Sequence, residues 1–431
     1  MTSSFEQLRS RRRFLGKAAV MTAAAWMNGL PALARASGGR VVVVGGGFAG
    51  ATSAKYLRRA DPTIKVTLIE REQRYVTGPF SNLVLAGVRT LNDLTIGYDR
   101  LSRNHGINVV RAEVVAIDAT GHHITLKDGH VLRYDRLVVA PGIDIDHGAL
   151  AGYGIDAPAI MPHAWVPGAQ TELLRGQLEA MKDGGTVLVT VPPTPFRCPP
   201  GPFERASLIA HYLRGRKPRS KILILDANES FPDQDLFLEG WRALYPGMIE
   251  WVPGSKGGRV VRVDTVTKAV HTTAGSHMAD VVNIIPPQKA GRIAVDGGLA
   301  NSTGWCPIDG RSFESTVHPD VHVIGDAAIA GKLPKSAGAA NSQAKVCAMA
   351  VAQLLNAQQV GDPSFVNACY SLVSPTYGIS LAGVFGLTPQ GIDLLPESFG
   401  TSPLRAPDKY RRRESRDAEG WYRNIVADSF T

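Results

Sequence analysis

Cysteine and long apolar runs are both scarce in this sequence of 431 residues. No two of the four cysteines lie close together in the chain, which argues against a structural zinc site and a small disulfide-rich fold. No apolar run reaches the roughly 18 residues that predict a membrane-spanning helix. Hydrophobic residues make up 44% of the chain and charged residues 20%, a globular balance that excludes a disordered or coiled-coil chain. The length predicts two or three domains.

The first residues have the order of an export signal. Ser10–Lys17 reads SRRRFLGK and resembles a twin-arginine signal, a short apolar run covers Ala18–Leu33, and Ala34–Ala36 has the small-x-small pattern of a cleavage site. The alternative is a basic tail followed by a buried helix. The signal predicts cleavage after Ala36 and a periplasmic protein, exported after it has folded around a prosthetic group.

The basic charge of the chain comes largely from this segment. Residues 1–36 carry six basic side chains and Glu6, so their removal lowers the net charge from +9 to +4. A polyanionic partner is therefore not required, and no nucleic-acid motif is present. Export also implies an oxidising compartment, in which cysteines can stay paired.

Short β-branched runs predict the buried strands of an α/β fold. Arg40–Val44 and Lys65–Glu70 flank a glycine-rich turn and a helix that ends near Arg59, which is a β-α-β opening. Thr186–Val191 and Lys221–Asp226 predict a second unit of the same kind. Two parallel sheets are therefore expected.

Later segments complete this plan. A strand is expected near Val131–Val139, another over Val321–Asp326 that returns to the first sheet, and a long helix over about Ser336–Leu355. The tail from about 365 is predicted to be irregular, with strand-like pieces such as Tyr377–Val384. The predicted divisions are a signal (1–36), a first dinucleotide domain in two parts (37–154 and 296–364), a second unit (155–295) and a C-terminal domain (365–431).

The turn after the first strand carries a dinucleotide motif. Gly45, Gly47 and Gly50 form G-x-G-x-x-G: the first allows the tight turn, the second admits the pyrophosphate, and the third lets helix and strand pack closely. Glu70, 20 residues beyond Gly50, is placed to accept hydrogen bonds from the adenosine ribose. The alternative is a glycine-rich loop that serves only as a turn.

A second motif favours FAD over NAD. The strand that ends in Gly325-Asp326 resembles the second FAD motif of flavoproteins with two dinucleotide domains, in which the aspartate binds the ribityl chain. The alternative is an aspartate that caps a helix. The N-terminus of the following helix, with Lys335 and Ser336, is then expected to point toward the flavin ring and to stabilise its reduced, negatively charged form. Lys335 can equally be a solvated side chain.

The second unit lacks a glycine motif of its own. After Thr186–Val191 the chain runs into Pro192–Pro202, where prolines remove the backbone N–H groups that would hold a pyrophosphate. NAD(P)H is therefore not the expected reductant.

The cysteines Cys198, Cys306, Cys347 and Cys369 allow three complete pairings, between which the residues do not choose. Cys347 is expected to be a buried small hydrophobe, and Cys306 can also be structural. Cys198 lies in the proline-rich loop at the end of a strand, where parallel sheets place ligands. A bridge from Cys198 to Cys369 would be either a structural staple or a redox-active pair beside the flavin.

Many segments resemble the flavoprotein subunit of flavocytochrome c sulfide dehydrogenase. They are Arg197–Pro202, Gly304–Pro307, Phe313–Ser315, His322–Asp326, Pro334–Ser336, Ala340–Gln343, Cys369–Ser371 and Gly420–Tyr422. The resemblance implies a glutathione-reductase-like α/β fold, with two Rossmann-like domains and a C-terminal interface domain. It implies a periplasmic sulfide dehydrogenase that passes electrons to a separate c-type cytochrome subunit, with the redox disulfide on Cys198 and Cys369.

One position departs from this resemblance. Some members bind FAD covalently through a cysteine in a Thr-Cys-x-x-Ser-Asn segment, but this chain has Gly78 in Thr77–Asn82. We therefore expect FAD to be held non-covalently and the haem to belong to the partner alone. The expected FAD-binding residues are Gly45, Gly47, Phe48, Ala49, Gly50, Glu70, Arg71, Gly78, Val114, Ala140, Gly142, Gly325, Asp326, Lys335 and Ser336.

The mechanism implied is attack of HS⁻ on the disulfide, followed by electron transfer to the flavin and then singly to haem. Cys198 is expected to meet the substrate and Cys369 to face the flavin. His163 and Glu204 lie near candidate substrate loops, and no general base is assigned. The alternatives are a sulfide:quinone reductase and a non-catalytic FAD-bearing partner of a sulfur-oxidation complex.

Overall fold

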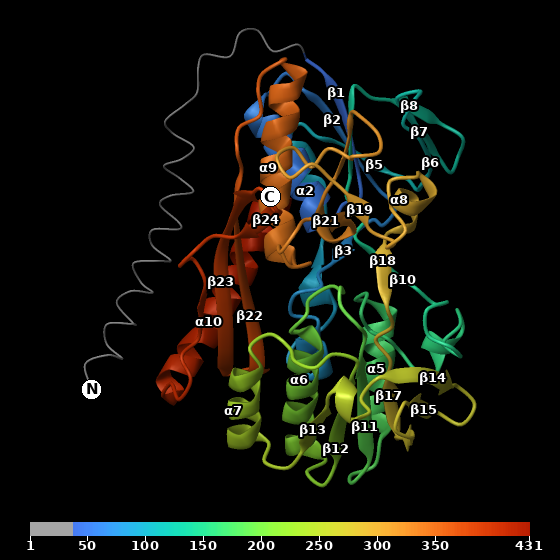
Figure 1. Ribbon diagram of the computed structural model, residues 1–431, viewed down its shortest axis with the longest axis vertical. Helices are drawn as coiled ribbons and strands as arrows, with labels where there is room; N and C mark the ends of the chain where they lie inside the picture. Colours follow the sequence, from blue (N-terminus) through green and yellow to red (C-terminus); the bar gives the residue numbers. More distant parts are fainter. Residues whose placement is uncertain (1–37) are drawn as a thin grey trace.

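The structure is a computed structural model that describes residues 38–431 (Figure 1). The predicted export signal, residues 1–36, lies outside the described residues. Among residues 38–431, no helix combines the length and apolarity needed to span a bilayer, and no cluster of histidine, cysteine and acidic side chains is arranged to hold a metal ion.

The first sheet has five parallel strands in the order β20-β9-β1-β2-β5. Its central strand is buried from Val41 to Val44, as a continuous β-branched run in a parallel sheet predicts. Helices α2 and α9 pack together over one face, and a small antiparallel sheet, β6-β7-β8, covers the other. The bounds are β1 (Arg40–Val44), α2 (Phe48–Ala60), β2 (Lys65–Glu70), α4 (Asp99–His105), β5 (Asn108–Arg111), β9 (Arg136–Val139), β20 (Val321–Val323) and α9 (Ala337–Leu355).

Two strands predicted in this region are shorter than expected. The segment Val131–Val139 is two strands, because β8 (Val131–Arg133) joins the small antiparallel sheet and only β9 joins the parallel one. The break lies at Asp135, whose carboxylate accepts a hydrogen bond of 2.6 Å from the backbone N–H of Arg40. The predicted strand Val321–Asp326 stops at Val323, because the chain turns at Gly325–Ala327 (η4), where Gly325 has a φ of +76°.

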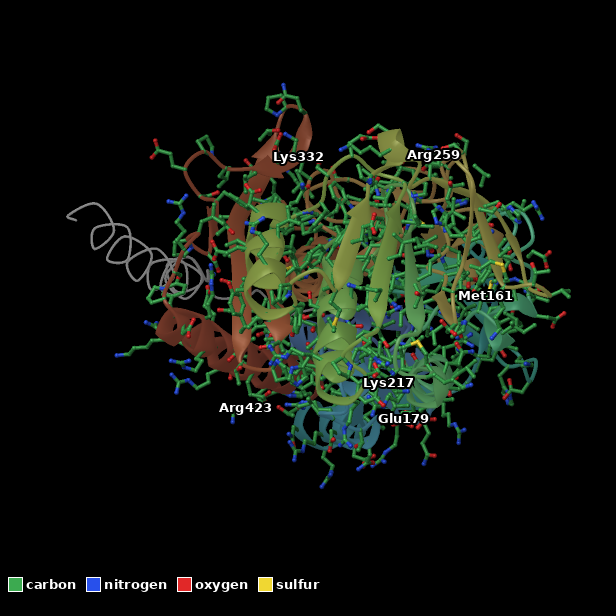
Figure 2. All side chains as sticks on the ribbon, turned by 90° about the horizontal axis from the view of Figure 1, so that it is seen from below. Met161, Glu179, Lys217, Arg259, Lys332 and Arg423 are labelled. Atoms are coloured by element: carbon green, nitrogen blue, oxygen red, sulfur yellow. The ribbon has the colours of Figure 1, made fainter. Side chains whose placement is uncertain are left out.

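The second unit has a four-stranded parallel sheet in the order β13-β12-β11-β17. Lys217 fastens two of its helices together: its buried ammonium group donates hydrogen bonds to the carbonyl oxygens of Leu178 and Glu179 at the end of α5 (Figure 2). The bounds are α5 (Ala169–Ala180), β11 (Thr186–Val191), α6 (Gly201–Arg216), β12 (Lys221–Asp226), α7 (Gln234–Leu244), β13 (Ile249–Val252) and β17 (Val281–Asn283).

The C-terminal region is regular, which corrects the prediction of an irregular tail. A long antiparallel pair, β22 (Ser364–Ser374) and β23 (Tyr377–Thr388), is followed by β24 (Gly391–Leu394), β25 (Gly400–Thr401) and helix α10 (Asp408–Phe430). The predicted strand-like piece Tyr377–Val384 is confirmed as part of β23. Strand β22 was not predicted, because polar residues such as Asn367 and Ser371 are buried along it and hide the alternation of polar and apolar residues. Strand β22 packs against both α9 and α6 (Figure 1).

The remaining elements are short. They are β3 (Tyr75–Val76), α3 (Asn82–Leu85), η1 (Asn92–Leu94), β4 (Thr95–Ile96), β6 (Val114–Asp118), β7 (His123–Leu126), β10 (Ile143–Ile145), η2 (Ala157–Ala159), η3 (Gly254–Lys256), β14 (Val260–Asp264), β15 (Ala269–Thr272), β16 (Ser276–Met278), β18 (Gln288–Ala290), α8 (Arg292–Asp296), β19 (Cys306–Pro307) and β21 (Ala328–Ile329).

Candidate functional site

The glycine-rich turn after β1 has the close contacts that its motif requires. Gly45 has a φ of +99°, and a Cβ there would lie 2.3 Å from the carbonyl oxygen of Ala140. A Cβ on Gly50 would lie 1.8 Å from the carbonyl oxygen of Gly45. The Glu70 carboxylate, at the end of β2, accepts hydrogen bonds from the N–H groups of Gly46 (2.6 Å) and Glu72 (2.9 Å). Strand, turn, helix and acid are thus arranged as in a dinucleotide site.

Several other predicted residues gather around this turn. Phe48 and Ala49 begin α2, Ala140 follows β9, and a Cβ on Gly325 would lie 2.9 Å from the Cβ of Ala49. Arg71 does not point into the turn: its side chain is 69% exposed and pairs with Glu72. The remaining positions are Val114 at the start of β6, Gly142 in the turn after Ala140, and Gly78, where a Cβ would have no neighbour within 4 Å. Their contacts with a cofactor stay predictions.

The Asp326 carboxylate indicates where a ligand is missing. Its Oδ1 atom is buried and has no hydrogen-bond partner among the described residues, and burial raises the pKa of its carboxyl group. A buried polar atom left in this state indicates a ligand that completes it. A ribityl hydroxyl would do so, and with the glycine turn this makes the residues present fit FAD.

Lys335 is held beside Asp326 by the backbone. Its Nζ atom donates hydrogen bonds to the carbonyl oxygens of Asp326 (2.6 Å) and Ala328 (3.0 Å) and lies 3.8 Å from the ring centroid of Trp305. Burial lowers the pKa of Lys335 to about 8. The side chain is therefore fixed rather than solvated, and it adds positive charge near the N-terminus of α9.

Cys198 is fastened to the start of the same helix. Its backbone N–H donates a hydrogen bond of 2.7 Å to the carbonyl oxygen of Lys335. Its Sγ atom lies 3.0 Å from the position that a Cβ of Gly201 would occupy, and Gly201 is the first residue of α6. The proline-rich loop thus places this sulfur at the N-terminus of a helix of 16 residues, where an approaching anion is favoured.

Cys369 reaches the site from the C-terminal sheet. It lies on β22 and interacts electrostatically with Cys198 and Glu204, so the two cysteines, 171 positions apart in the chain, share one site. Both are free thiols that are partly exposed, and burial raises the pKa of each. Their pairing as a disulfide stays a prediction. Cys306 and Cys347 are fully buried, as predicted for structural residues.

The charge of Glu204 acts on both sulfurs. Its carboxylate accepts hydrogen bonds from the Leu372 backbone N–H (2.9 Å) and from the Asn82 side chain (2.8 Å), and burial raises its pKa. His163 is a poor candidate for a base: burial lowers its pKa to about 4, and its Nδ1 atom already accepts a hydrogen bond from the Trp165 backbone.

Two residues of the site were not singled out from the sequence. The Arg197 guanidinium donates a hydrogen bond to the Trp165 carbonyl oxygen, and its charge acts on Cys198 and Asp326. Its position directly before Cys198 was a usable signal. The Trp165 ring lies beside Gly201, with Cη2 2.8 Å from the ideal Cβ position, and no local pattern predicted it.

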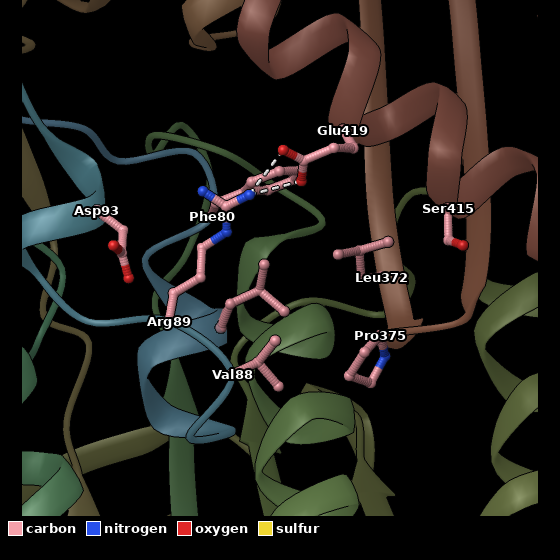
Figure 3. A pocket seen from close by; sticks show the side chains of 9 residues that line it. Phe80, Val88, Arg89, Asp93, Leu372, Pro375, Ser415 and Glu419 are labelled. Carbon is pink, nitrogen blue, oxygen red and sulfur yellow. Dashed lines mark hydrogen bonds and ion pairs between the residues drawn. The ribbon is translucent and has the colours of Figure 1, made fainter.

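A surface hollow of about 510 Å³ opens on the outer side of this region (Figure 3). Its wall includes Phe80, which stacks on Tyr422 of α10 at 4.6 Å between ring centroids, and Leu372 of β22. Arg89 and Glu419 form an ion pair of 2.6 Å across it. Neither cysteine and none of the predicted FAD-binding residues lines the hollow.

Three family models match separate parts of the chain. The central domain of the sulfide dehydrogenase (flavocytochrome c) flavoprotein chain matches residues 171–286. The flavin-binding domain of flavocytochrome c sulphide dehydrogenase matches residues 361–430, and the pyridine nucleotide-disulphide oxidoreductase domain matches residues 39–153.

Curated relatives include two sulfide-oxidising proteins by name. The sulfide dehydrogenase (flavocytochrome c) flavoprotein chain of Chlorobaculum thiosulfatiphilum is 67% identical over 45 residues, which cover 10% of this chain and 94% of that one. The mitochondrial sulfide:quinone oxidoreductase of Mus musculus is 24% identical over 295 residues. That match covers 66% of this chain and 65% of the mouse protein.

Solved structures share the fold. The sulfide:quinone oxidoreductase of Aquifex aeolicus superimposes with a TM-score of 0.70 at 16% identity, over 90% of this chain and 92% of that one. A ferredoxin reductase of Rhodopseudomonas palustris gives 0.61 at 18% identity, over 80% and 82%. The predicted glutathione-reductase-like α/β class is thereby confirmed. From its family models and its Chlorobaculum relative, the chain belongs to the flavocytochrome c sulfide dehydrogenase flavoproteins, a family of FAD oxidoreductases.

Proposed function

We propose that this protein is a periplasmic sulfide dehydrogenase that works through Cys198, Cys369 and non-covalently held FAD, and passes electrons to a c-type cytochrome subunit. One observation carries the proposal: both cysteines lie at the start of α9, and Cys198 lies close to the Asp326 carboxylate, whose Oδ1 atom has no hydrogen-bond partner among the described residues. The two flavocytochrome c sulfide dehydrogenase families that match the chain support sulfide as the substrate and a cytochrome as the partner.

The proposed reaction at the two sulfurs is a thiol–disulfide exchange. HS⁻ attacks Sγ of Cys198 in the disulfide, the Cys198–Cys369 bond breaks, Cys198 becomes a persulfide, and Cys369 leaves as a thiolate. A second sulfide removes the outer sulfur as HSS⁻ and leaves Cys198 as a thiol. Loss of its proton to solvent and of two electrons from the pair restores the disulfide. Bound FAD supplies the acceptor for those two electrons and can release them singly.

The residues around the sulfurs suit an anionic substrate. Arg197 places a positive charge near Cys198, and the N-terminus of α6 adds to it. Lys335 places a further positive charge beside Asp326, where the cofactor is expected. Arg197 thereby offsets part of the negative charge of Glu204, which also acts on Cys198.

An anaerobic titration tests the proposal. We expect stoichiometric sulfide to bleach the flavin absorbance of the purified holoprotein, and a c-type cytochrome to reoxidise it. Reoxidation by a quinone but not by cytochrome would indicate a sulfide:quinone reductase, the named function of relatives with the same fold. If sulfide does not bleach the flavin, either of the protein alone or with the cytochrome subunit bound, both enzyme functions are contradicted. The remaining function is then that of a non-catalytic FAD-bearing partner.

We predict a specific loss of rate in Gly201→Ala. A methyl group there would lie 3.0 Å from Sγ of Cys198 and 2.8 Å from Cη2 of Trp165, so the sulfur has to shift. Such a displacement lowers the rate of flavin bleaching by sulfide by roughly 10- to 100-fold. Stopped-flow spectra measure it, and Gly215→Ala, at an open position on the same helix, is the matched control.

A further inference from the structure

Cys369 sits in a hydrogen-bond arrangement that Cys198 lacks. Its Sγ atom lies 3.5 Å from Nδ2 and 3.6 Å from Oδ1 of Asn367, which is on the same face of β22 and only 1% exposed. Among the described residues, no side chain forms a hydrogen bond with Sγ of Cys198. The two sulfurs of the site are therefore chemically unequal.

The Asn367 amide is held in place from the helix side. Ser336, the N-cap of α9, donates its hydroxyl proton to Oδ1 of Asn367 at 2.8 Å, while its Oγ accepts a hydrogen bond from the Ala339 backbone N–H at 3.1 Å. Because Oδ1 is engaged by the serine, the N–H₂ end of the amide is available to the sulfur. The backbones of β22 and α9 pack closely here, since a Cβ on Gly338 of α9 would lie 3.1 Å from the Ala368 carbonyl oxygen of β22.

This arrangement serves both protonation states of Cys369. The thiol can donate its S–H to Oδ1, and the thiolate can accept an N–H from Nδ2, so loss of the proton exchanges one hydrogen bond for another without leaving a buried atom unpaired. The chain Ala339 N–H, Ser336 and Asn367 also connects the sulfur to the N-terminus of a helix of 19 residues, which favours negative charge.

We propose that Asn367, oriented by Ser336, is a positioning residue that stabilises the Cys369 thiolate and thereby makes Cys369 the leaving group and Cys198 the sulfur that sulfide attacks. The proposal rests on the function proposed above and assigns separate roles to its two cysteines. A thiol of lower pKa leaves faster in thiol–disulfide exchange, so the hydrogen bond sets the direction of attack. The hydrogen bonds of Asn367 and Ser336 oppose the effect of burial, which raises the pKa of the Cys369 thiol.

The test measures each thiol separately and needs no sulfide. The FAD-loaded full chain is reduced with a phosphine and alkylated with iodoacetamide over a range of pH, and peptide mass spectrometry reports Cys198 and Cys369 individually. In Asn367→Leu we expect alkylation of Cys369 at neutral pH to slow by about 10-fold and its pH midpoint to rise by about one unit. The midpoint for Cys198 should stay within about 0.3 units of wild type.

Three further variants separate positioning from folding. Asn367→Asp keeps the size of the side chain but replaces the donor with an acceptor of negative charge, so it should raise the Cys369 midpoint at least as much as leucine does. Ser336→Ala should give a smaller rise. Ser371→Ala removes a buried hydroxyl from the same face of β22 and should change nothing at Cys369.

The outcomes distinguish this proposal from the function on which it rests. An unchanged Cys369 midpoint in both Asn367→Leu and Asn367→Asp, or an equal shift at Cys198, would overturn the positioning role. If the midpoints shift as expected but sulfide does not bleach the wild-type flavin, the thiolate assignment stands and the sulfide dehydrogenase proposal fails.

Discussion

Cys198→Ser is expected to slow sulfide-dependent bleaching of the flavin by at least ~10³-fold. A serine hydroxyl forms no bond with Cys369. The disulfide that sulfide attacks in the first step of the proposed mechanism is therefore absent from this variant. The substitution changes one atom at a partly exposed position, and it leaves the backbone hydrogen bond to Lys335 available. Stopped-flow measurement of flavin absorbance after anaerobic mixing with sulfide gives the rate directly.

Two controls keep that result specific. Dithionite should still reduce the flavin of Cys198→Ser, because the glycine turn and Asp326 are untouched. Cys347→Ala removes a cysteine that is fully buried on α9 and should bleach at close to the wild-type rate. Wild-type kinetics in Cys198→Ser would refute the role of the cysteine pair, since the remaining thiol has no nearby partner with which to cycle.

Strands buried on both faces were predictable from local sequence. Arg40–Val44, Lys65–Glu70, Thr186–Val191 and Lys221–Asp226 all appear with the predicted bounds, because each is a short β-branched run next to a turn. The glycine turn was equally predictable, because its contacts are between residues close in the chain or in neighbouring strands, and they leave no room for a Cβ at Gly45 or Gly50. Local chemistry decides both features.

Features set by distant contacts were missed. Strand β22 buries Asn367 and Ser371, whose polarity suggested a loop, because α9 and α6 cover its faces. The amide of Asn367 is oriented toward Cys369 only because it forms a hydrogen bond with Ser336, 31 positions away in the chain. A single sequence does not reveal a contact between residues so far apart, so the hydrogen bonds around Cys369 could be found only in the structure.

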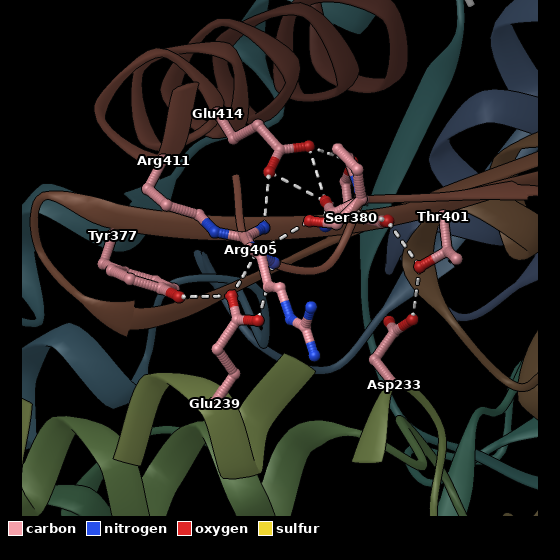
Figure 4. Close-up of polar contacts among 10 residues, drawn as sticks. Asp233, Glu239, Tyr377, Ser380, Thr401, Arg405, Arg411 and Glu414 are labelled. Atoms are coloured by element: carbon pink, nitrogen blue, oxygen red, sulfur yellow. Dashed lines mark hydrogen bonds and ion pairs between the residues drawn. The ribbon is translucent and has the colours of Figure 1, made fainter. Parts of the chain in front are cut away.

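The second large effect is on stability, in Arg411→Met. Its side chain is 1% exposed, and the guanidinium bonds Glu239 of α7 at 2.8 Å, the Pro403 carbonyl oxygen at 2.9 Å and Glu414 at 3.5 Å (Figure 4). Methionine fills a similar volume but removes the positive charge that the Glu239 and Glu414 carboxylates both face. Breaking a buried pair in this way costs about 3–5 kcal/mol, which for a chain of this size is equivalent to a drop in Tm of roughly 4–6 °C.

The neighbouring Arg412→Met is the matched control, because its side chain is 59% exposed and lies 3.9 Å from an exposed Asp408. Solvent screens that pair, so its loss should change stability by no more than about 0.5 kcal/mol. Adding Glu414→Gln to Arg411→Met removes the stranded charge and keeps an acceptor for the Ser380 and Ser402 hydroxyls, which bond Glu414 at 2.9 and 2.6 Å. The double variant should therefore regain part of the lost Tm. If calorimetry finds it less stable than Arg411→Met, the cost comes from lost packing between α10 and α7, and the charge of Glu414 is not its cause.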